Sequence, residues 1–435
     1  MTLGRLQAMF ARAGAKKLFA KPLAENDNSK NQVYFGPDFE ALNLFPTEGV
    51  FPAGPKNSIF KAKLGFCWLA KDGSVAPAPG AQLILYPQYP EVRFSGFLRG
   101  CAAAPSSLMA GRMNGRILFL ATTHGQRVLG YVAAGDDEIS KEFCSLNLRA
   151  TSGVFVELGL APSSHEENAR SQLLTELHRI SQLGWIDSKQ LDSNGRLKPC
   201  RAPQCGGFTL EAELGIAKNS TSEPDFLGWE VKQHSVSSFA RPDSGTAITL
   251  MTPEPTDGFY KQHGAEAFVR KFGYPDKRNR PDRRNFGGIY RVGQRQPTTG
   301  LTMNIIGYDE TTGRILDASG AVALFNDTGE LAAAWAFSSL LEHWSRKHAR
   351  AVYVPSMRRI EPSWQYAYSP RVRLAQRTDG LRLLNALANG RVYYDPGIKL
   401  ENESSSKPKS KKRSQFRVAS KHLPMLYETV ETVEV

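Results

Sequence analysis

A short segment in the middle of the chain, 222–232, holds three side chains whose types and spacing could cleave a phosphodiester bond. A Pro-Asp pair ends at Asp225, and after four intervening residues come Glu230, Val231 and Lys232. Residues two apart in a β-strand share a face, so Glu230 and Lys232 are expected to project together while Val231 points into a core. A turn before the strand could bring Asp225 beside them.

Two carboxylates and an ammonium at one strand end suit metal-assisted hydrolysis. The oxygens of Asp225 and Glu230 would be hard ligands for Mg²⁺, which keeps several waters and bridges to phosphate oxygens. The ion would stabilise charge on the phosphate and help to generate hydroxide, while the Lys232 ammonium could orient the attacking water. The segment therefore predicts a catalytic centre with Mg²⁺ as its cofactor.

The same spacing also arises by chance, and Glu and Lys on an exposed strand edge are usually only a solvated ion pair. The apolar neighbours Phe226, Leu227, Trp229 and Val231 favour the catalytic interpretation. If these side chains pack into a core, they fix the positions of the ligands.

A further carboxylate lies upstream in residues 206–216, which resemble a short helix with Glu211 on one face. Glu211 could bind a second metal or a metal-bound water. It could equally be one of two surface glutamates, with Glu213 the other.

The elements around this segment alternate between helix and strand. Apolar residues at Leu173, Leu177 and Ile180 have the spacing of an amphipathic helix over 166–184, and the residues just before it mark a domain boundary. Further strands are predicted at 226–233, 246–252, 301–309 and 350–355, and further helices at 265–273, 330–348 and 379–390. Interleaved strands and helices predict an α/β domain with a mixed sheet covered by helices.

The N-terminal part has a different pattern. Residues 1 to about 30 look like a polar, basic lead-in, and short strand-like runs separated by Gly, Pro, Asn and Asp follow to about residue 160. The runs lie at 32–35, 58–66, 81–86, 91–98, 115–122 and 127–134. This pattern predicts a β-rich barrel or sandwich, and a chain of 435 residues is long enough for two such domains.

The charge of the chain points to a polyanionic partner. The formal net charge is +13, so nucleic acid is the first candidate, although ribosome-associated factors and ordinary solvated surfaces can be equally basic.

The cysteines and the apolar runs give weaker signals. The five cysteines are few, odd in number and mostly isolated, which argues against a disulfide framework and for a reducing cytoplasm. Cys200 and Cys205 suggest zinc, but no second Cys/His pair lies nearby at finger spacing. No apolar run reaches the ~18 residues of a membrane span. We expect a cytoplasmic protein.

From about Leu173 onward the sequence resembles the MvaI/BcnI family of restriction endonucleases, which are relatives of the MutH mismatch-repair nickase within the PD-(D/E)XK fold. The segments that carry the resemblance are LGWID (183–187), TLEAEL (209–214), EPDFLGWEVKQH (223–234), ITLMTPEPT (248–256), VRKFGYPDK (269–277) and SQFRV (414–418). The resemblance implies a restriction-endonuclease-like domain over 165–435. It also implies that Asp225 and Glu230 bind the metal, that Lys232 is the catalytic lysine and that Glu211 is an auxiliary carboxylate.

The same resemblance implies an activity. The family cuts double-stranded DNA at short G·C-rich sites related to CC(A/T)GG or CC(C/G)GG, as a monomer that nicks the two strands in sequence. A cognate DNA methyltransferase is the expected companion. Two alternatives remain open, namely a MutH-like repair nickase and a DNA-binding regulator with an inactive nuclease half.

Two basic loops are the expected DNA contacts of this half. The first, 276–295, carries seven lysine or arginine residues, and the second, 401–413, leads into SQFRV. Phosphate contact is the simplest role for most of them, although a merely solvated charge run is the alternative. Arg417 is the candidate for reading guanine, because arginine pairs bidentately with that base. The DNA-contacting residues expected in these loops are Arg283, Arg284, Lys411, Lys412, Arg413 and Arg417.

The N-terminal part resembles, over a short and interrupted stretch, the effector DNA-binding domains of the EcoRII type. The matching segments are 31–46, 81–86 and 91–97. The resemblance implies a β-pseudobarrel over 1–160 whose two arms embrace DNA, with Gln32 in one arm and Glu91 and Arg93 in the other. Ordinary core-strand positions are an equally good explanation of these residues. The complete layout is most similar to enzymes of the UbaLAI type.

Overall fold

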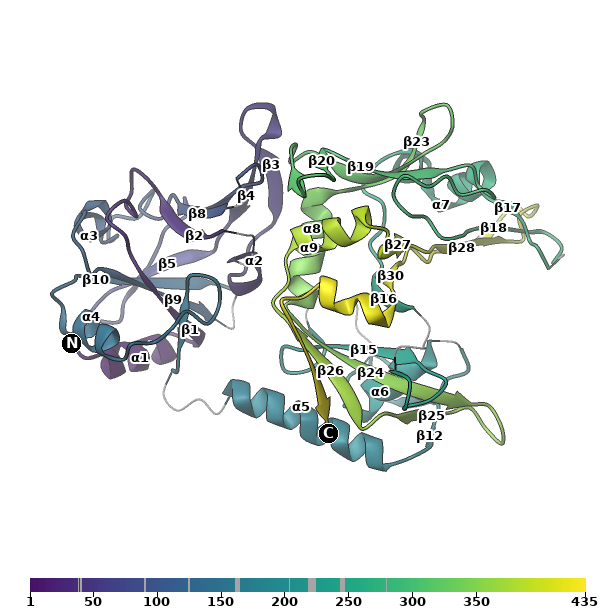
Figure 1. The fold of residues 1–435 in the computed structure, drawn as a ribbon, viewed down its shortest axis with the longest axis horizontal. Coiled ribbons are helices and arrows are strands. Elements are labelled where there is room, and N and C mark those ends of the chain that lie inside the picture. The colour runs from purple at the N-terminus through teal and green to yellow at the C-terminus, as the bar shows by residue number, and fades with distance from the viewer. Residues whose placement is uncertain are drawn as a thin grey trace. The chain divides into compact units, whose positions relative to one another are not determined.

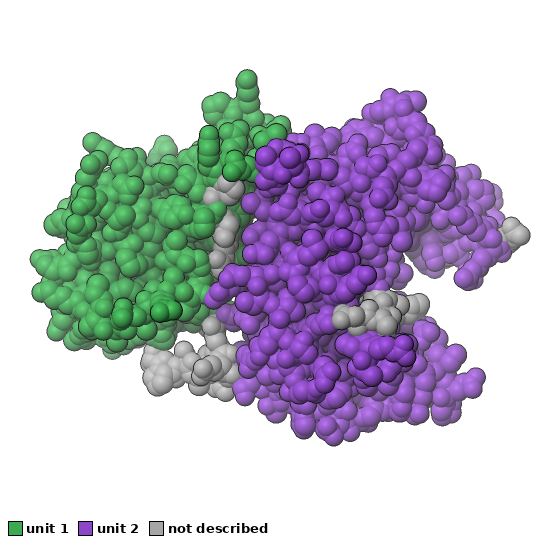
Figure 2. All heavy atoms as spheres, in the orientation of Figure 1, with its two compact units in different colours: residues 1–166, 314–319 green, residues 167–313, 320–435 purple. Residues whose placement is uncertain are grey.

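The computed structural model of this chain describes residues 1–37, 39, 41–89, 91–123, 126–160, 165–202, 204–217, 224–242, 247–278 and 280–435. The chain forms two compact units, which Figure 2 shows in different colours. Unit 1 contains Met1–Glu166 together with Arg314–Ser319, and unit 2 contains Glu167–Gly313 and Gly320–Val435.

Unit 1 is built from two sheets (Figure 1). The six-stranded sheet has the order β11 (Val156–Leu158), β1 (Ala15–Pro22), β9 (Ile117–Thr123), β10 (Val128–Ala133), β5 (Phe66–Leu69), β6 (Val75–Pro77). The five-stranded sheet has the order β2 (Val33–Gly36), β8 (Glu91–Ser95), β7 (Gln82–Tyr86), β4 (Ile59–Lys63), β3 (Val50–Ala53). The short helices are α1 (Leu3–Arg12), α2 (Ala41–Leu44), α3 (Ser106–Ala110), α4 (Glu138–Ser145) and the 3-10 turn η1 (Pro55–Asn57). The β-rich character predicted for this half is confirmed, while its assignment as a pseudobarrel stays a prediction.

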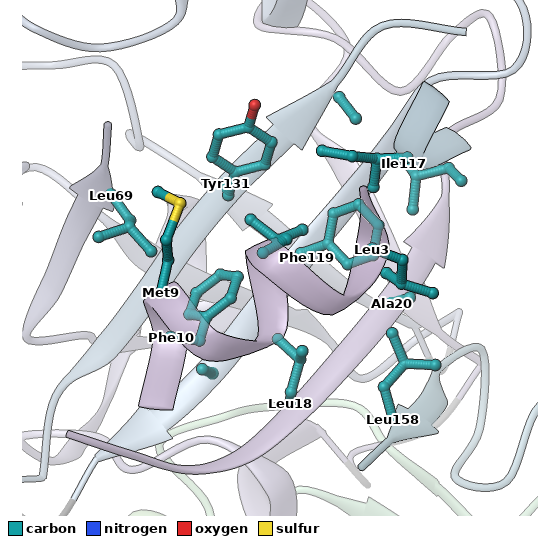
Figure 3. Packing of buried hydrophobic residues seen from close by; sticks show 14 of the residues in the cluster. Leu3, Met9, Phe10, Leu18, Ala20, Leu69, Ile117, Phe119, Tyr131 and Leu158 are labelled. Carbon is teal, nitrogen blue, oxygen red and sulfur yellow. The ribbon is translucent and has the colours of Figure 1, made fainter. Parts of the chain in front are cut away.

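The prediction that residues 1 to about 30 form a polar lead-in is wrong. Helix α1 and strand β1 lie in this stretch, and their apolar side chains enter the core of unit 1 (Figure 3). Leu3, Leu6 and Phe10 recur at helical spacing and are buried, and the side chain of Thr2 caps the helix by accepting the Arg5 amide. Arg5 and Gln7 lie between them, and together with the basic residues that follow they obscure this pattern in the sequence.

The larger sheet of unit 2, here called the nuclease sheet, is mixed. Its path is β12 (Ile186–Asp187), β25 (Gln365–Tyr368), β24 (Arg350–Arg359), β26 (Arg371–Gln376), β31 (Thr429–Glu434), and β15 (Glu230–Ser235) pairs in parallel with β24. Helices α5 (His165–Gln182) and α6 (Cys205–Glu213) contribute Leu173, Leu177 and Leu210 to the core cluster that also holds Val231 and Val352. The predicted mixed sheet with helices packed on it is therefore confirmed.

The rest of unit 2 consists of smaller sheets and three helices. The first sheet is β16 (Ile248–Met251), β30 (Phe416–Val418), β27 (Val392–Tyr394); the second is β17 (Tyr274–Pro275), β18 (Arg283–Gly287), β28 (Gly397–Glu401), β29 (Lys409–Lys411); the third is β19 (Thr302–Ile306), β22 (Ala321–Phe325), β23 (Leu331–Ala336). Two-stranded pairs are β13 (Lys189–Leu191) with β14 (Leu197–Pro199), and β20 (Tyr308–Asp309) with β21 (Arg314–Ile315). The helices are α7 (Phe259–Phe272), α8 (Phe337–His348), α9 (Gly380–Ala388) and the 3-10 helix η3 (Ser420–Met425).

The continuous helix predicted over 330–348 is wrong in its first third. Residues 331–336 form strand β23, and α8 begins only at Phe337. The run of alanines favours a helix by intrinsic propensity. In the structure, antiparallel pairing with β22 and burial of Trp335 at the sheet override that preference. The predicted helix at 379–390 is confirmed as α9, and that at 265–273 is part of the longer α7.

No helix among the described residues is long and apolar enough to cross a membrane.

Candidate active site

A tight turn immediately precedes the catalytic strand. Phe226 and Trp229 exchange both backbone hydrogen bonds, at 2.9 and 2.8 Å, and the two residues between them, Leu227 and Gly228, have φ of 47° and 84°. Positive φ at both central residues defines the type I′ hairpin turn. The strand predicted over 226–233 therefore begins only at Glu230, because the first four of these residues form the turn.

This turn folds Asp225 back onto the strand. One carboxylate oxygen of Asp225, Oδ2, accepts a hydrogen bond of 3.0 Å from the backbone N–H of Val231. Asp225 is half-buried. The four residues between Asp225 and Glu230 thus form the turn that brings the two carboxylates to one end of the strand, as the sequence predicted.

Glu230 and Lys232 share one face of β15. The Lys232 ammonium donates to Oε1 of Glu230 at 2.5 Å, and the two side chains are 21% and 1% exposed. Such a buried carboxylate is costly to leave uncompensated, so the ammonium beside it stabilises its charge. The pair is therefore not the exposed, solvated ion pair that was the alternative explanation of this spacing.

The opposite face of the strand is anchored in the core. Trp229 and Val231 are buried in the cluster formed by α5, α6 and β24, and Val231 lies in register with Val352. This packing fixes the position of the strand, as predicted from Trp229 and Val231. Leu227, which was expected to pack in the same core, is exposed instead.

Helix α6 carries Glu211 and packs on the same face as Val231. Gly206 at its start is so close to β15 that an added Cβ would lie 2.9 Å from the Gln233 side chain, and its carbonyl accepts the Tyr368 hydroxyl at 2.7 Å. Glu211 is half-buried. Across the described part of the chain, no three His, Cys, Asp or Glu side chains gather closely enough to hold a metal. The structure thus brings together Asp225, Glu230 and Lys232 but does not add Glu211 to a three-carboxylate cluster.

A disulfide joins Cys200 to Cys205 at the start of α6. The cysteine pattern had argued against disulfides, so this pairing corrects that expectation for these two residues. They had also suggested zinc, and the bond between their sulfurs leaves neither thiolate to bind it. Cys67, Cys101 and Cys144 have free thiols.

The chemistry of the donor set fits a hard divalent cation. Asp225 and Glu230 supply carboxylate oxygens, and Mg²⁺ commonly takes one or two carboxylates and completes its shell with water and substrate phosphate. Two carboxylates are therefore sufficient, and the nearby ammonium already demonstrates that positive charge is stable beside Glu230.

The sheet formed by β17, β18, β28 and β29, here called the basic arm, contains the first predicted DNA-contact residues. Arg283 is 10% exposed and pairs with Asp276 at 3.2 Å and Glu401 at 3.7 Å. Arg284 pairs with Glu403 at 3.0 Å. Both arginines are engaged inside the arm, which gives them a structural role whatever else they contact.

A hollow in the basic arm collects Arg283 and four cations that were not named among the predicted DNA contacts, Lys277, Arg278, Arg280 and Lys399. It is lined by Tyr274, Asp276, Lys277, Arg278, Arg280, Arg283, Asn285 and Lys399. Burial lowers the pKa of Lys399, and the charges of Arg283 and Arg413 lower it further. A hollow with this excess of positive charge is suited to an anion. The spacing RNRPDRR shows the charge but not which side chains face the hollow.

The remaining predicted contacts lie at the end of the basic arm and on β30. Lys411 and Lys412 are 66% and 53% exposed and pair with Glu401 at 2.9 Å and Glu254 at 3.7 Å. Arg413 is exposed.

Arg417, the predicted guanine reader, is half-buried on β30. Its guanidinium pairs with Asp395 at 2.7 Å and donates to the Ala247 carbonyl at 2.5 Å. In this arrangement the side chain is held in place, and a base would have to compete with these two partners or use the remaining donors.

In unit 1 the three predicted arm residues lie close together. Arg93 pairs with Glu91 at 3.0 Å and donates to the Asn31 carbonyl at 3.1 Å, while Gln32 accepts from the Tyr86 hydroxyl at 3.5 Å. The antiparallel pairing of β2 with β8 produces this arrangement. The side chain of Arg93 is 37% exposed.

Comparison with known proteins places this geometry in context. The MvaI/BcnI restriction endonuclease family matches residues 174–427. Among solved structures, the restriction endonuclease MvaI–cognate DNA substrate complex is 17% identical, with a TM-score of 0.46, over 60% of this chain and 97% of that one. MvaI in the absence of DNA is 15% identical, with a TM-score of 0.34, over 61% and 97%. The comparison with curated proteins gave no match.

Proposed function

The chain belongs to the MvaI/BcnI restriction endonuclease family, a family of DNA hydrolases, and on that premise we propose that it is a Mg²⁺-dependent type II restriction endonuclease. Its substrate is double-stranded DNA with a short G·C-rich, pseudo-palindromic site of the CC(A/T)GG or CC(C/G)GG kind. The observation that carries the proposal is the tight turn that hydrogen-bonds Asp225 to the strand bearing Glu230 and Lys232.

Each of the three side chains has a separate task. Asp225 and Glu230 would hold Mg²⁺, which when bound supplies Lewis-acid stabilisation of the scissile phosphate. Lys232 lies beside Glu230 and is 21% exposed, so its ammonium can reach a water at the surface of the site. There it orients the water for attack and stabilises the hydroxide that forms.

The basic arm supplies the phosphate contacts in this proposal. Lys277, Arg278 and Arg280 line its hollow, and Lys411 and Lys412 are exposed at its edge. Arg417 lies on the neighbouring β30, where it is held by Asp395. In Figure 1, β16, β27 and β30 are drawn between the basic arm and the nuclease sheet.

Unit 1 is proposed to be a second DNA reader. Its support is the cluster of Gln32, Glu91 and Arg93 on neighbouring strands and the resemblance of these strands to EcoRII-type effector domains. The protein is proposed to act as a monomer that nicks the two strands in sequence, with a cognate methyltransferase protecting host DNA.

The proposal is tested with purified protein, supercoiled plasmid and Mg²⁺, followed by sequencing of the ends. Lys232→Met should reduce cleavage by a factor of about a thousand or more, since it removes the group that stabilises the attacking hydroxide. Affinity for a duplex containing the site should stay within about threefold. Removing the metal with a chelator should have the same effect as the substitution.

The matched control is Arg371→Gln, which removes an exposed ion pair on the far strand β26 of the same sheet and should leave the rate unchanged. Normal cleavage by Lys232→Met would overturn the active-site assignment. Conversion of the plasmid to nicked circles alone, with no linear product, would instead identify a repair-type nickase.

A further inference from the structure

One face of the basic arm is polar and forms the wall of its hollow. Tyr274, Asn285 and Lys399 are in register on three neighbouring strands, so their side chains project from the same face of the sheet. Arg283 lies two residues before Asn285 on β18 and shares that face. All four side chains line the hollow, whereas Phe286 is buried on the opposite face. The strand register thus selects which polar side chains a ligand of the hollow can meet.

The guanidinium of Arg283 is held in the hollow by its inner nitrogen. The side chain is 10% exposed, and Nε lies 3.2 Å from Oδ1 of Asn285 and 3.2 Å from Oδ2 of Asp276. Nη1 is 3.7 Å from the nearest carboxylate oxygen of Glu401, which is too far for a hydrogen bond. Within the described ranges of the chain, neither terminal nitrogen has a hydrogen-bond acceptor. Nearly enclosed donors without acceptors cost free energy, so a ligand with two adjacent acceptors is stabilised there.

The partners of Nε are themselves fixed. The Asn285 amide donates to Oδ2 of Asp276 at 2.9 Å, and Oδ1 of Asp276 accepts the backbone N–H of Arg278 at 2.8 Å. The side chain of Asp276 is only 8% exposed. This network holds the guanidinium in one orientation before any ligand binds, which is what recognition of a particular acceptor geometry requires.

In DNA, two adjacent acceptors are offered by a backbone phosphate and by the O6 and N7 atoms of guanine in the major groove. Phosphate is attracted by uncompensated positive charge. Around Arg283 that charge is offset by the carboxylates of Asp276 and Glu401, which would repel a phosphate and affect a neutral base much less. The exposed cations at the rim of the hollow, Lys277, Arg278 and Arg280, are better suited to the backbone.

We propose that Arg283 reads a guanine of the recognition site, with Asp276 and Asn285 as positioning residues that orient its guanidinium. This inference rests on the proposed function. It assigns base reading to a different residue from Arg417, whose two terminal nitrogens already donate to protein oxygens. The terminal nitrogens of Arg283 donate to O6 and N7 of the base, and the major groove is wide enough to admit a β-ribbon such as β18 with β28.

The test removes one acceptor from the DNA at a time. Short duplexes that contain CCAGG or CCCGG are made with each guanine replaced in turn by 7-deazaguanine, which lacks N7 but still pairs with cytosine. Binding is measured without metal, so that no cleavage occurs. The wild-type protein should lose affinity about tenfold at one guanine of its site. Arg283→Lys keeps the charge but not the two-pronged donor, so its loss at that guanine should be less than about twofold.

Two comparisons separate base reading from other roles of Arg283. Single neutral methylphosphonates replace the backbone phosphates in a second set of duplexes, and Arg283→Lys should respond to them as the wild type does. The matched control is Arg371→Gln, which removes an exposed ion pair on β26 and should keep the tenfold loss. An Arg283→Lys protein that binds every duplex more weakly but keeps the 7-deazaguanine loss would overturn the proposal, as would one that has lost only a methylphosphonate response.

If Arg283→Lys does not fold, Asn285→Ala still decides. This change removes one of the two partners of Nε and leaves Asp276, so the loss at the same guanine should fall from about tenfold to about threefold. An unchanged loss contradicts the positioning role. A protein that cleaves a defined site but ignores every 7-deazaguanine would overturn this inference alone. Selective binding that depends on Arg283, without cleavage under any metal condition, would instead refute the proposed function.

Discussion

Asp225 reaches the catalytic strand because Leu227 and Gly228 both adopt positive φ. Glycine takes this conformation without steric cost, but for a leucine it costs roughly 1–2 kcal/mol. Leu227 is 48% exposed, so little of its side chain packs against the core. The turn is therefore a strained connection next to the carboxylate of Asp225.

The strain at Leu227 predicts a gain on substitution. Leu227→Asn creates Asn-Gly, the preferred pair for a type I′ turn, and should stabilise the turn by about 1 kcal/mol. Gly228→Ala should destabilise it by a similar amount and slow cleavage, since it loosens Asp225. Hydrogen exchange of the peptide that contains the Val231 amide measures both effects, at roughly fivefold in rate per kcal/mol. Identical exchange in the two variants would show that the turn does not control the position of Asp225.

At this scale the sequence singled out three residues that the structure brings together, Asp225, Glu230 and Lys232, but not the means of placing them. Their catalytic role stays a prediction. The alternation Glu-Val-Lys is visible in the letters and predicted the shared face of Glu230 and Lys232. The reversal at Leu227 is not visible, since leucine is a poor residue for positive φ and its neighbours suggest a continuous strand. The hydrogen bonds between the side chains of Tyr353, Tyr427 and His348 join three segments that are distant in the sequence, so no local sequence pattern predicts them.

Among the elements, the basic arm contains charged residues with two different roles. Some form ion pairs within the arm, and others line its hollow. Arg284 is held by the carboxylate of Glu403, whereas Lys277, Arg278 and Arg280 line the hollow. Arg283 does both, because it pairs with Asp276 and also borders the hollow. A count of charges along the loop cannot make this distinction, because it depends on the register of β18 with its neighbours.

The division predicts two kinds of response to salt. Changing Lys277, Arg278 and Arg280 to Gln should reduce the slope of log affinity against log salt by about 2.7, or 0.9 for each lost phosphate contact. Arg284→Gln should lower the melting temperature, because it removes the ion pair with Glu403 and the hydrogen bond to the Gly273 carbonyl. Its salt slope should stay as in the wild type. The salt slopes are measured by DNA titration between low and physiological salt, and the melting temperature is measured by thermal unfolding. Equal slopes for the two variants would reject the assignment.

Elements were predicted best where one pattern dominates a long stretch, as in α5 and α9. They failed where propensity and tertiary packing disagree. The alanines of β23 favour a helix, and only pairing with β22 makes them a strand. Helix α1 was missed for the opposite reason. Its buried apolar residues are separated in the sequence by Arg5 and Gln7, which are not buried.

For the whole molecule, the proposed second reader in unit 1 predicts cooperation between sites. If unit 1 binds one copy of the site, it raises the local concentration of the nuclease on that DNA. A plasmid with two sites should then be cut several times faster than a plasmid with one. In the full chain, Arg93→Ala should abolish this difference and leave the one-site rate unchanged.

The control for this experiment is Lys71→Ala, which changes an exposed residue in a turn of the same unit. A two-site preference that survives Arg93→Ala would remove the arm cluster from DNA binding. The intact chain is the appropriate material, because Arg314–Ser319 belongs to unit 1 and a fragment ending near residue 160 lacks it.

That short return segment also has a consequence for how the protein is made on the ribosome. Ile315 and Ala318 are buried, and the Ala318 amide donates to the Asn57 carbonyl, so unit 1 has all of its residues only once this segment is made. At about 5–20 residues per second, the roughly 150 residues from Glu166 to Arg314 take on the order of ten seconds to synthesise. During that interval unit 1 lacks the residues that Arg314–Ser319 contributes to it, and this gives a nascent-chain chaperone a defined time in which to act.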